Sequence, residues 1–248
     1  MSNTKLRRRA LLGGGPDVVD FGLSVKWLKC NLAGDKLTNN ESDYGYYYQW
    51  ASTTGYPDAS THVFSSSWTD TPYCIVAAYV SFSKYGTKDK KYTLEPMDDA
   101  VTVLLGSEYR MPTIDEFNEL FNHCGLTLSG SFLSGSLSGT TSVSSTGRYW
   151  VAAGTTVDGI KYKNPGCLCV GQDITKRVFF PASGRCINSS VSNVGYQGGY
   201  WSSSLDSSNS KDPYNLCFTS SNYNSDIRPA NHGYYRYSGF SVRGVKIA

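Results

Sequence analysis

Apolar and polar residues alternate over short stretches through most of this chain, a pattern that is typical of β-strands. In Tyr44–Ala51 the large residues Tyr46, Tyr48 and Trp50 occupy every second position, which predicts a strand with one buried face. Further short strands are predicted at Asp17–Ala33 (a strand pair), Arg148–Ala153, Lys176–Arg185 and Gly198–Ser204. The aromatic residues expected to anchor the core are Trp27, Trp50, Phe180, Trp201 and Phe240.

Two stretches carry helical signals instead. Pro96–Leu105 begins with proline, which suits the first helical position, and Gly106 is a natural C-terminal stop. Thr113–Cys124 begins with Thr113 followed three residues later by Glu116, the spacing of a capping box. We therefore expect these two stretches to be the long helices of the protein, with their apolar stripes turned toward the core.

The composition favours a loop-rich, strand-rich protein over a helical one. The chain has 248 residues, with 25 glycines, 19 tyrosines and a hydrophobic content of 40%, which supports a substantial core. Charged residues make up only 17% and the net charge is +3, so we expect no nucleic-acid partner. No run approaches the roughly 18 apolar residues of a membrane-spanning helix, so no membrane span is expected either.

The first 16 residues are expected to form a flexible basic arm, and residues 17–248 a single domain. Arg7–Arg9 followed by Ala10–Leu12 resembles the opening of a secretory or twin-arginine signal, but Gly13–Asp17 interrupts the apolar run at once. A signal needs an apolar region of about 7–15 residues. We therefore expect a protein made in the cytoplasm without a signal peptide, whose arm docks onto something larger.

Motifs of catalysis and of metal binding are missing from the sequence. No serine has glycine at both flanking second positions, and neither a glycine-rich phosphate loop nor a His-Glu-x-x-His motif occurs. Cys167 and Cys169 are too close together for a zinc knuckle, and the histidines (His62, His123 and His232) are isolated. We expect a non-enzymatic protein without a metal or cofactor, whose seven cysteines are mostly buried, reduced thiols.

The most distinctive stretch is Ser202–Ser238, here called the C-terminal segment, which is dominated by Ser, Tyr, Asn and Asp. Strand-like blocks at Gly198–Ser204 and Gly239–Val245 bracket it. Antibody loops use the same residue types, because tyrosine gives rigid contact area and Ser and Asn give adaptable hydrogen bonds. The candidate ligand-binding residues are Asp206, Asn209, Tyr214, Asn222, Tyr223, Asn224, Ser225, Asp226, Asn231, His232, Tyr234, Tyr235 and Tyr237. The alternatives are an ordinary solvated loop, or binding on the Thr53–Tyr73 or Leu126–Ser145 loops.

Several blocks, in chain order, resemble one known family. The blocks are VDFGLSVKWLKCN (Val19–Asn31), YGYYYQWA (Tyr44–Ala51), EYRMPTIDEFNEL (Glu108–Leu120), VFFPASGR (Val178–Arg185), GGYWSSS (Gly198–Ser204), YNLCF (Tyr214–Phe218) and RYSGFSVRGV (Arg236–Val245). Together they resemble the Fibrobacter succinogenes major paralogous domain of gut bacteria and their phages. The resemblance implies an α+β, C-type-lectin-like fold, with two helices flanking twisted antiparallel sheets and with the C-terminal strand beside the N-terminal one. Gly244 departs from the usual Cys or Pro, and Leu126–Ser145 is longer than expected.

The resemblance also implies a function. Proteins diversified by retroelements, such as phage tropism determinants, carry a hypervariable segment at the C-terminal end of that fold. We therefore expect a receptor-binding protein of a phage or prophage, which recognises a host cell-surface protein or glycan and reaches the virion tail or the cell surface after assembly. The arm at residues 1–16 is a candidate contact for a homo-oligomer or a tail-fibre partner. Two alternatives remain, a surface adhesin or pilus-tip module, and a formylglycine-generating type of enzyme that would use Cys186 and Cys217.

Overall fold

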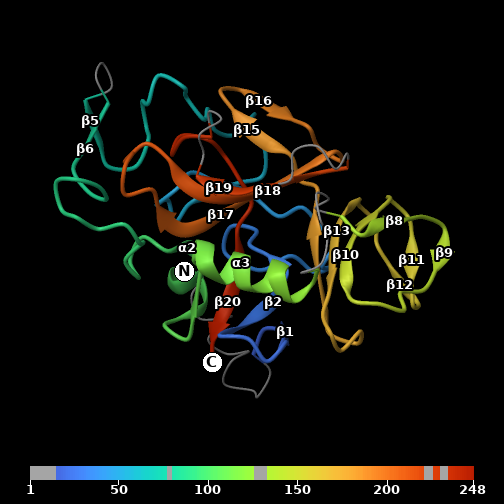
Figure 1. The fold of residues 1–248 in the computed structure, drawn as a ribbon. Helices are drawn as coiled ribbons and strands as arrows, with labels where there is room; N and C mark the ends of the chain where they lie inside the picture. Colours follow the sequence, from blue (N-terminus) through green and yellow to red (C-terminus); the bar gives the residue numbers. More distant parts are fainter. Residues whose placement is uncertain (1–14, 77–79, 126–132, 221–225, 230–233) are drawn as a thin grey trace.

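The structure is a computed structural model that describes residues 15–76, 80–125, 133–220, 226–229 and 234–248, with side chains left out at positions 76 and 226–229. Strands account for 38% of the structure and helices for 8%. Figure 1 shows many small sheets gathered around one central helix. Most of the predicted basic arm at residues 1–16 lies outside the described residues.

Two four-stranded sheets form the base of the molecule and its side lobe. The first has the order β1 (Val18–Val19), β2 (Val25–Asn31), β20 (Arg243–Ile247) and β7 (Tyr109–Arg110). The second has the order β14 (Arg177–Pro181), β13 (Gly166–Val170), β10 (Gly147–Val151) and β8 (Gly135–Leu137). A three-stranded sheet extends the side lobe, in the order β12 (Ile160–Lys161), β11 (Thr156–Val157) and β9 (Thr140–Thr141).

The upper part of the molecule holds the other sheets. A three-stranded antiparallel sheet has the order β17 (Gln197–Leu205), β18 (Pro213–Thr219) and β19 (Asp226–Pro229). Three hairpin-like pairs surround it: β3 (Tyr47–Tyr48) with β4 (Gly55–Tyr56), β5 (Cys74–Val76) with β6 (Ser81–Phe82), and β15 (Arg185–Ile187) with β16 (Ser190–Ser192).

The two ends of the described chain meet in the first sheet, as expected. β20 pairs antiparallel with β2, so that Trp27 lies opposite Val245. Arg243, which is fully buried, reinforces this pairing: its Nε donates to Asn31 Oδ1 (2.7 Å) and one terminal nitrogen donates to the Leu28 carbonyl (3.0 Å). Its other terminal nitrogen donates to the Phe179 carbonyl of β14 (2.9 Å). One side chain therefore joins three segments that are distant in the sequence.

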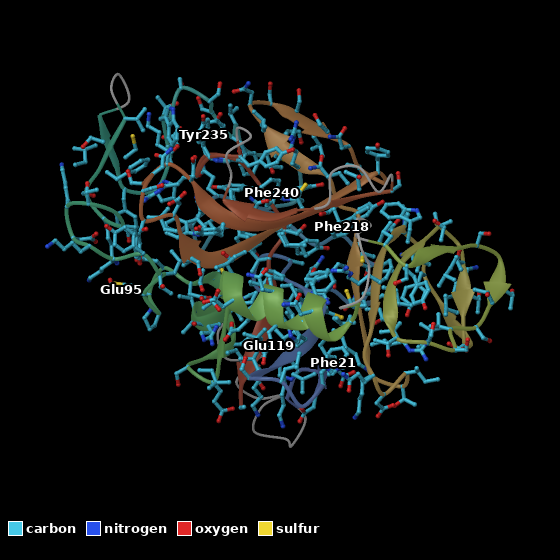
Figure 2. All side chains as sticks on the ribbon, in the orientation of Figure 1. Phe21, Glu95, Glu119, Phe218, Tyr235 and Phe240 are labelled. Atoms are coloured by element: carbon cyan, nitrogen blue, oxygen red, sulfur yellow. The ribbon has the colours of Figure 1, made fainter. Side chains whose placement is uncertain are left out.

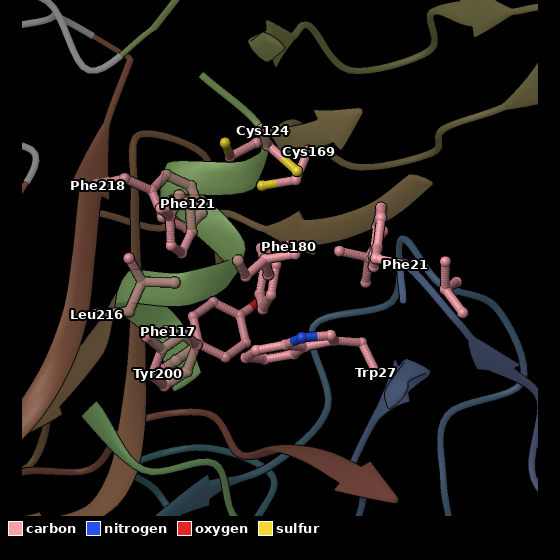
Figure 3. Close-up of a cluster of buried hydrophobic side chains, with 14 of the residues drawn as sticks. Phe21, Trp27, Phe117, Phe121, Cys124, Cys169, Phe180, Tyr200, Leu216 and Phe218 are labelled. Atoms are coloured by element: carbon pink, nitrogen blue, oxygen red, sulfur yellow. The ribbon is translucent and has the colours of Figure 1, made fainter. Parts of the chain in front are cut away.

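The longer helix, α3 (Ile114–His123), begins as predicted. Thr113 is its N-cap, and a capping box joins the side chains of Thr113 and Glu116 to each other's backbone amides. Phe117, Leu120 and Phe121 are buried on its inner side, in one cluster with residues of β2, β14, β17 and β18. Figure 3 shows this cluster between the helix and the neighbouring strands. The helix is therefore the centre of the main core.

The other helix, α2 (Ala100–Leu105), is shorter than predicted. Asp99 is its N-cap and accepts hydrogen bonds from the amides of Val101 and Thr102, so the helix begins four residues after Pro96. Gly106 ends it at a positive φ of 97°, as the sequence indicates. Proline fits the first turn of a helix, but here the aspartate side chain offers the better cap, and it decides where the helix starts.

The predicted fold class is wrong. We expected an α+β, C-type-lectin-like fold with two helices flanking twisted antiparallel sheets, but the described structure is mostly β and divided into many small sheets. The two helices have only six and ten residues. In addition, β8 pairs parallel with β10 and β9 pairs parallel with β11. Helical signals fixed the position of the helices but not their share of the core, which is filled mainly by side chains from strands.

The predicted core anchors are confirmed. Trp27, Trp50, Phe180, Trp201 and Phe240 are all fully buried. They belong to two clusters, one around α3 and one between β17, the C-terminal strand region and residues 48–51. The period-two pattern thus identified the inward-facing positions correctly, although it did not predict how the sheets are arranged.

Candidate functional site

The C-terminal segment begins and ends in backbone that is fixed in the interior. β17 pairs with β18, with Tyr200 opposite Leu216. After the segment, the amide of Phe240 donates to the Tyr48 carbonyl (3.1 Å), and the amide of Ser241 donates to the Gly199 carbonyl (3.1 Å). The chain is therefore held on both sides of the residues that were predicted to bind a ligand.

The two faces of the β17–β18–β19 sheet have different surroundings. Tyr200 and Leu216 belong to the cluster around α3. Side chains alternate along a strand, so Trp201 points to the opposite face. There its ring centroid lies 4.6 Å from that of Phe240. The candidate binding residues are consequently divided between the two faces.

Three candidates lie on the β17–β18 hairpin. Tyr214 is half-buried and shares the α3 face with Leu216; burial, followed by the charges of Asp206 and Asp115, raises the pKa of Tyr214. Asp206 accepts hydrogen bonds from the amide and hydroxyl of Ser208. The amide nitrogen of the Asn209 side chain donates to Asp212 Oδ2 (2.8 Å). Asp206 and Asn209 thus belong to the turn between β17 and β18, and Tyr214 lies in β18, on the face opposite Trp201.

Tyr234 lies on the opposite face and is tied to the scaffold. Its ring centroid is 5.4 Å from that of Phe240, and the guanidinium carbon of Arg185 lies 4.6 Å from the Tyr234 ring. Gln197 Nε2 donates to its hydroxyl (3.3 Å). A tyrosine with a packed ring and a bonded hydroxyl contributes to the fold as well as to any surface.

Tyr235 and Tyr237 form an aromatic group with Trp68, a residue of the Thr53–Tyr73 loop. The Trp68 ring centroid lies 5.4 Å from that of Tyr235 and 4.8 Å from that of Tyr237. Tyr235 and Trp68 are half-buried, whereas Tyr237 is only 8% exposed. Figure 2 shows Tyr235 in the upper part of the molecule, above Phe240. Two of the regions that the sequence offered as alternative binding sites thus share one surface.

Arg236, which the sequence analysis did not single out, lies beneath this aromatic group and is fully buried. Its terminal nitrogens donate to the carbonyls of Lys84 (3.1 Å) and Tyr85. Its guanidinium carbon lies 3.9 Å from the centre of the Phe82 ring and 4.9 Å from that of Trp50. Burial lowers the pKa of Arg236 to about 9. In the sequence, Arg236 stands between Tyr235 and Tyr237. This position between two aromatic residues is the sequence signal that could have drawn attention to it.

A small recess adjoins the aromatic group. It encloses about 120 Å³, and its lining includes Ser81, Phe82, Thr87, Lys88 and Ser210. Phe82 also contacts Trp68, with 5.7 Å between ring centroids, so the recess and the aromatic group are continuous. The recess brings the 80–89 stretch against the β17–β18 hairpin, which no sequence pattern indicated.

Asp212 is a second residue that the sequence did not reveal. It is 3% exposed, and its Oδ1 has no hydrogen-bond partner. Burial, and then the neighbouring Asp206 charge, raise the pKa of Asp212 to about 6. Across the hairpin, the Asp206 amide donates to the Asp212 carbonyl (3.0 Å). The carboxylates of Asp206 and Asp212 are therefore close together at this turn. The carbonyl of Lys211, the residue before Asp212, accepts a hydrogen bond from the Arg236 amide (3.2 Å).

The remaining candidates cannot be placed in this arrangement. Asn222, Tyr223, Asn224, Ser225, Asn231 and His232 lie outside the described residues. Asp226 is described by its backbone alone, which pairs with Cys217 in the β18–β19 ladder. Their proposed contact with a ligand stays a prediction.

The cysteine positions bear on the enzyme alternative. Cys186 is fully buried, and burial raises its pKa to about 12. Cys217 is 8% exposed and its sulfur accepts a hydrogen bond from Gln197 Nε2 (2.8 Å). A reactive cysteine needs a lowered pKa and access to substrate. The buried, high-pKa thiol of Cys186 is the opposite of what that alternative requires, and the side chain of Cys217 is also little exposed.

Within the described residues, no group of three or more His, Cys, Asp or Glu side chains has the arrangement of a metal site. Neither of the two described helices has the length and apolar character needed to cross a membrane. Comparison of the chain with family models, curated proteins and solved structures finds no match.

Proposed function

We propose that this protein binds a ligand on the surface of a host cell, a protein or a glycan, as the receptor-binding protein of a phage or prophage. The observation that carries the proposal is that half-buried rings on one surface lie over a fully buried interior. Trp68 and Tyr235 are half-buried and in mutual contact, while Phe240 and Arg236 beneath them are fully buried. Rigid aromatic rings on a fixed support give contact area at low entropic cost.

The composition of the C-terminal segment supports the same proposal. Its Ser, Tyr, Asn and Asp content is what a diversity-generating retroelement would leave, and the sequence blocks resemble a family in which such segments vary. The scaffold in this proposal is the β-rich one described above. The arm at residues 1–16 would join the protein to a tail fibre or to further copies of the chain, after synthesis in the cytoplasm.

A surface adhesin or pilus-tip module is the second candidate, because the same binding surface would serve it. Neighbouring genes separate the two: tail genes and a reverse transcriptase favour the phage protein, and export or pilus genes favour the adhesin. The buried, high-pKa Cys186 argues against the enzyme alternative.

The direct test uses fluorescently labelled protein on a panel of gut bacterial cells. We compare Tyr235→Ser with Tyr214→Ser, because both tyrosines are half-buried, but Tyr235 contacts Trp68 whereas Tyr214 lies in β18 on the α3 face. Tyr235→Ser should lower adsorption by about tenfold or more, since an aromatic anchor contributes about 2 kcal/mol. Tyr214→Ser should leave adsorption unchanged if binding is confined to the Trp68 face. Equal adsorption of all three proteins would reject the proposed surface.

A further inference from the structure

We propose that Trp68 and the recess beside it are a fixed part of the binding face, and that the recess receives an acidic side chain of a protein partner. The inference rests on the proposed function, because it names the class of partner for the same surface. It adds residues outside the C-terminal segment, which would remain constant while that segment varies.

The recess has the size of a site for one group rather than for a whole ligand. At about 120 Å³ it is well below the roughly 300–1,000 Å³ of pockets that enclose small molecules. Its shape is set by a close approach between two segments: a Cβ at Gly86 would lie 2.7 Å from Ser210 Cβ. Because Gly86 also has a φ of 143°, only glycine fits there without strain.

The charge at the recess favours a carboxylate. Lys84 forms ion pairs with Asp98 and Glu95. Asp89 accepts hydrogen bonds from the backbone amides of Tyr85 (2.9 Å), Gly86 (3.1 Å) and Lys91 (3.2 Å). Lys88, by contrast, is exposed and forms no ion pair with another described residue. Among the lining residues, Lys88 is therefore the charged group whose contacts within the described structure are not already taken up, and the hydroxyls of the lining can donate further hydrogen bonds.

The aromatic side of the recess suits a protein partner. The rings of Trp68, Tyr235 and Tyr237 are in mutual contact. Tryptophan and tyrosine are among the residues that contribute most to protein–protein binding energy. Serines at positions 65–67 adjoin Trp68 and are half-buried or exposed, which gives the hot spot a polar rim. An apolar side chain of the partner against Trp68, next to an acidic one in the recess, would match this surface.

Backbone strain in the same stretch is independent support. Ten non-glycine residues among the described ones have a positive φ, and six of them are Trp68, Asp70, Tyr73, Val80, Tyr85 and Lys90. A bulky residue at positive φ costs on the order of 1–3 kcal/mol, and such costs concentrate at functional sites. The stretch is therefore held in a particular conformation by its surroundings, as a preformed site requires.

The test is selection of random peptides, displayed on filamentous phage, against the immobilised full chain. Selected peptides should carry Asp or Glu beside an apolar residue, and their binding should weaken at high salt. Lys88→Glu and Trp68→Ala should each weaken these peptides by about tenfold or more. Lys161→Glu is the matched control, because Lys161 is also exposed but belongs to β12 in the side lobe, and it should have no effect.

Lys88→Glu changes only an exposed side chain, so the test stands even if Trp68→Ala does not fold. The inference is overturned if no peptides are enriched, if enriched peptides lack acidic residues, or if they bind Lys88→Glu as well as the parent. Cell adsorption separates this result from the proposed function. If Tyr235→Ser loses adsorption while Lys88→Glu retains it, the result supports the proposed function but rejects the recess as a site for an acidic side chain. Adsorption independent of Tyr235 would remove the proposed function instead.

Discussion

The two faces of the β17–β18–β19 sheet differ in the side chains that they carry. Toward α3, the sheet contributes Tyr200, Leu216 and Phe218, which are large, fully buried and surrounded by other apolar side chains. On the opposite face, the same strands contribute the polar residues Gln197 and Asn215 together with Trp201 and Cys217. A single sheet thus combines an apolar cluster on one side with an interior of mixed polar and aromatic residues, here called the mixed side, on the other.

The mixed side and its surroundings also hold several buried polar atoms that have no hydrogen-bond partner. Asp212 Oδ1, Asn215 Nδ2, Arg236 Nε and Ser238 Oγ all lie in or beside the hairpin and the C-terminal segment. Each unsatisfied buried group costs about 1–3 kcal/mol. Such atoms also occur elsewhere among the described residues, including Trp27 Nε1 in the main core and the Tyr162 hydroxyl, so they mark a cost here without setting this region apart.

Adjacent residues of β18 offer the strongest test of this difference. Phe218→Ala should lower the free energy of unfolding by about 3–5 kcal/mol, because Phe218 is fully buried on the α3 face and the change leaves a cavity. Cys217→Ala, on the other face, should cost only about 1 kcal/mol, mainly the hydrogen bond from Gln197. Urea unfolding measures both. Similar losses would mean that the two faces contribute equally to the core.

The two buried arginines near the C-terminus extend the comparison. Arg243→Met should cost about 3 kcal/mol, because it leaves the acceptors on Asn31 and Phe179 without a donor at the centre of the scaffold. Arg236→Met should cost less, about 2 kcal/mol: the carbonyls of Lys84 and Tyr85 lose their donor, but Arg236 Nε has no partner to lose and methionine keeps apolar contact with Phe82. Thermal unfolding ranks the pair, and a larger loss for Arg236→Met would contradict the assignment.

The sequence predicted the scaffold side well, for a physical reason. Period-two alternation reports which side chains face inward, and this identified Trp27, Trp201 and Phe240 correctly. The capping box at Thr113 is equally local, and it was correct. The fold class was wrong because the share of helix depends on where each helix starts and on how sheets associate, and neither is encoded in local periodicity.

The binding side was predicted only in outline. Composition drew attention to Tyr235, but its contact with Trp68, and the recess that Lys88 forms with Ser210, join segments that are distant in the sequence and have no sequence signature. Composition also does not distinguish the candidate tyrosines from one another. The structure separates them, because Tyr237 is almost buried whereas Tyr235 is half-buried.

The Asp212 carboxyl group predicts that the free energy of unfolding depends on pH. Since its folded-state pKa is raised from 3.8 to about 6, this group favours folding below pH 3.8, and that contribution is lost as the pH rises through 6. Asp212→Asn should therefore gain about 1–3 kcal/mol relative to the parent between pH 4 and pH 7.5. Asp206→Asn, which removes only the second cause, should show a smaller change of the same sign. A pH-independent difference in unfolding free energy would show that Asp212 is not strained by its charge.

The smallest expected effect concerns the tyrosines of the aromatic group. Tyr235→Ser should change the free energy of unfolding by no more than about 0.5 kcal/mol, because its ring is half-buried at the surface. Tyr237→Ser should cost about 1–3 kcal/mol, since its ring is 8% exposed and packs against Trp68 at 4.8 Å. Tyr234→Ser should fall between them, because it loses contact with Phe240 and Arg185. Melting curves of the three variants measure the order, with Tyr→Phe at each position as the control that keeps the ring. If Tyr235→Ser is the most destabilising of the three, the aromatic group belongs to the core and the binding face must be sought elsewhere.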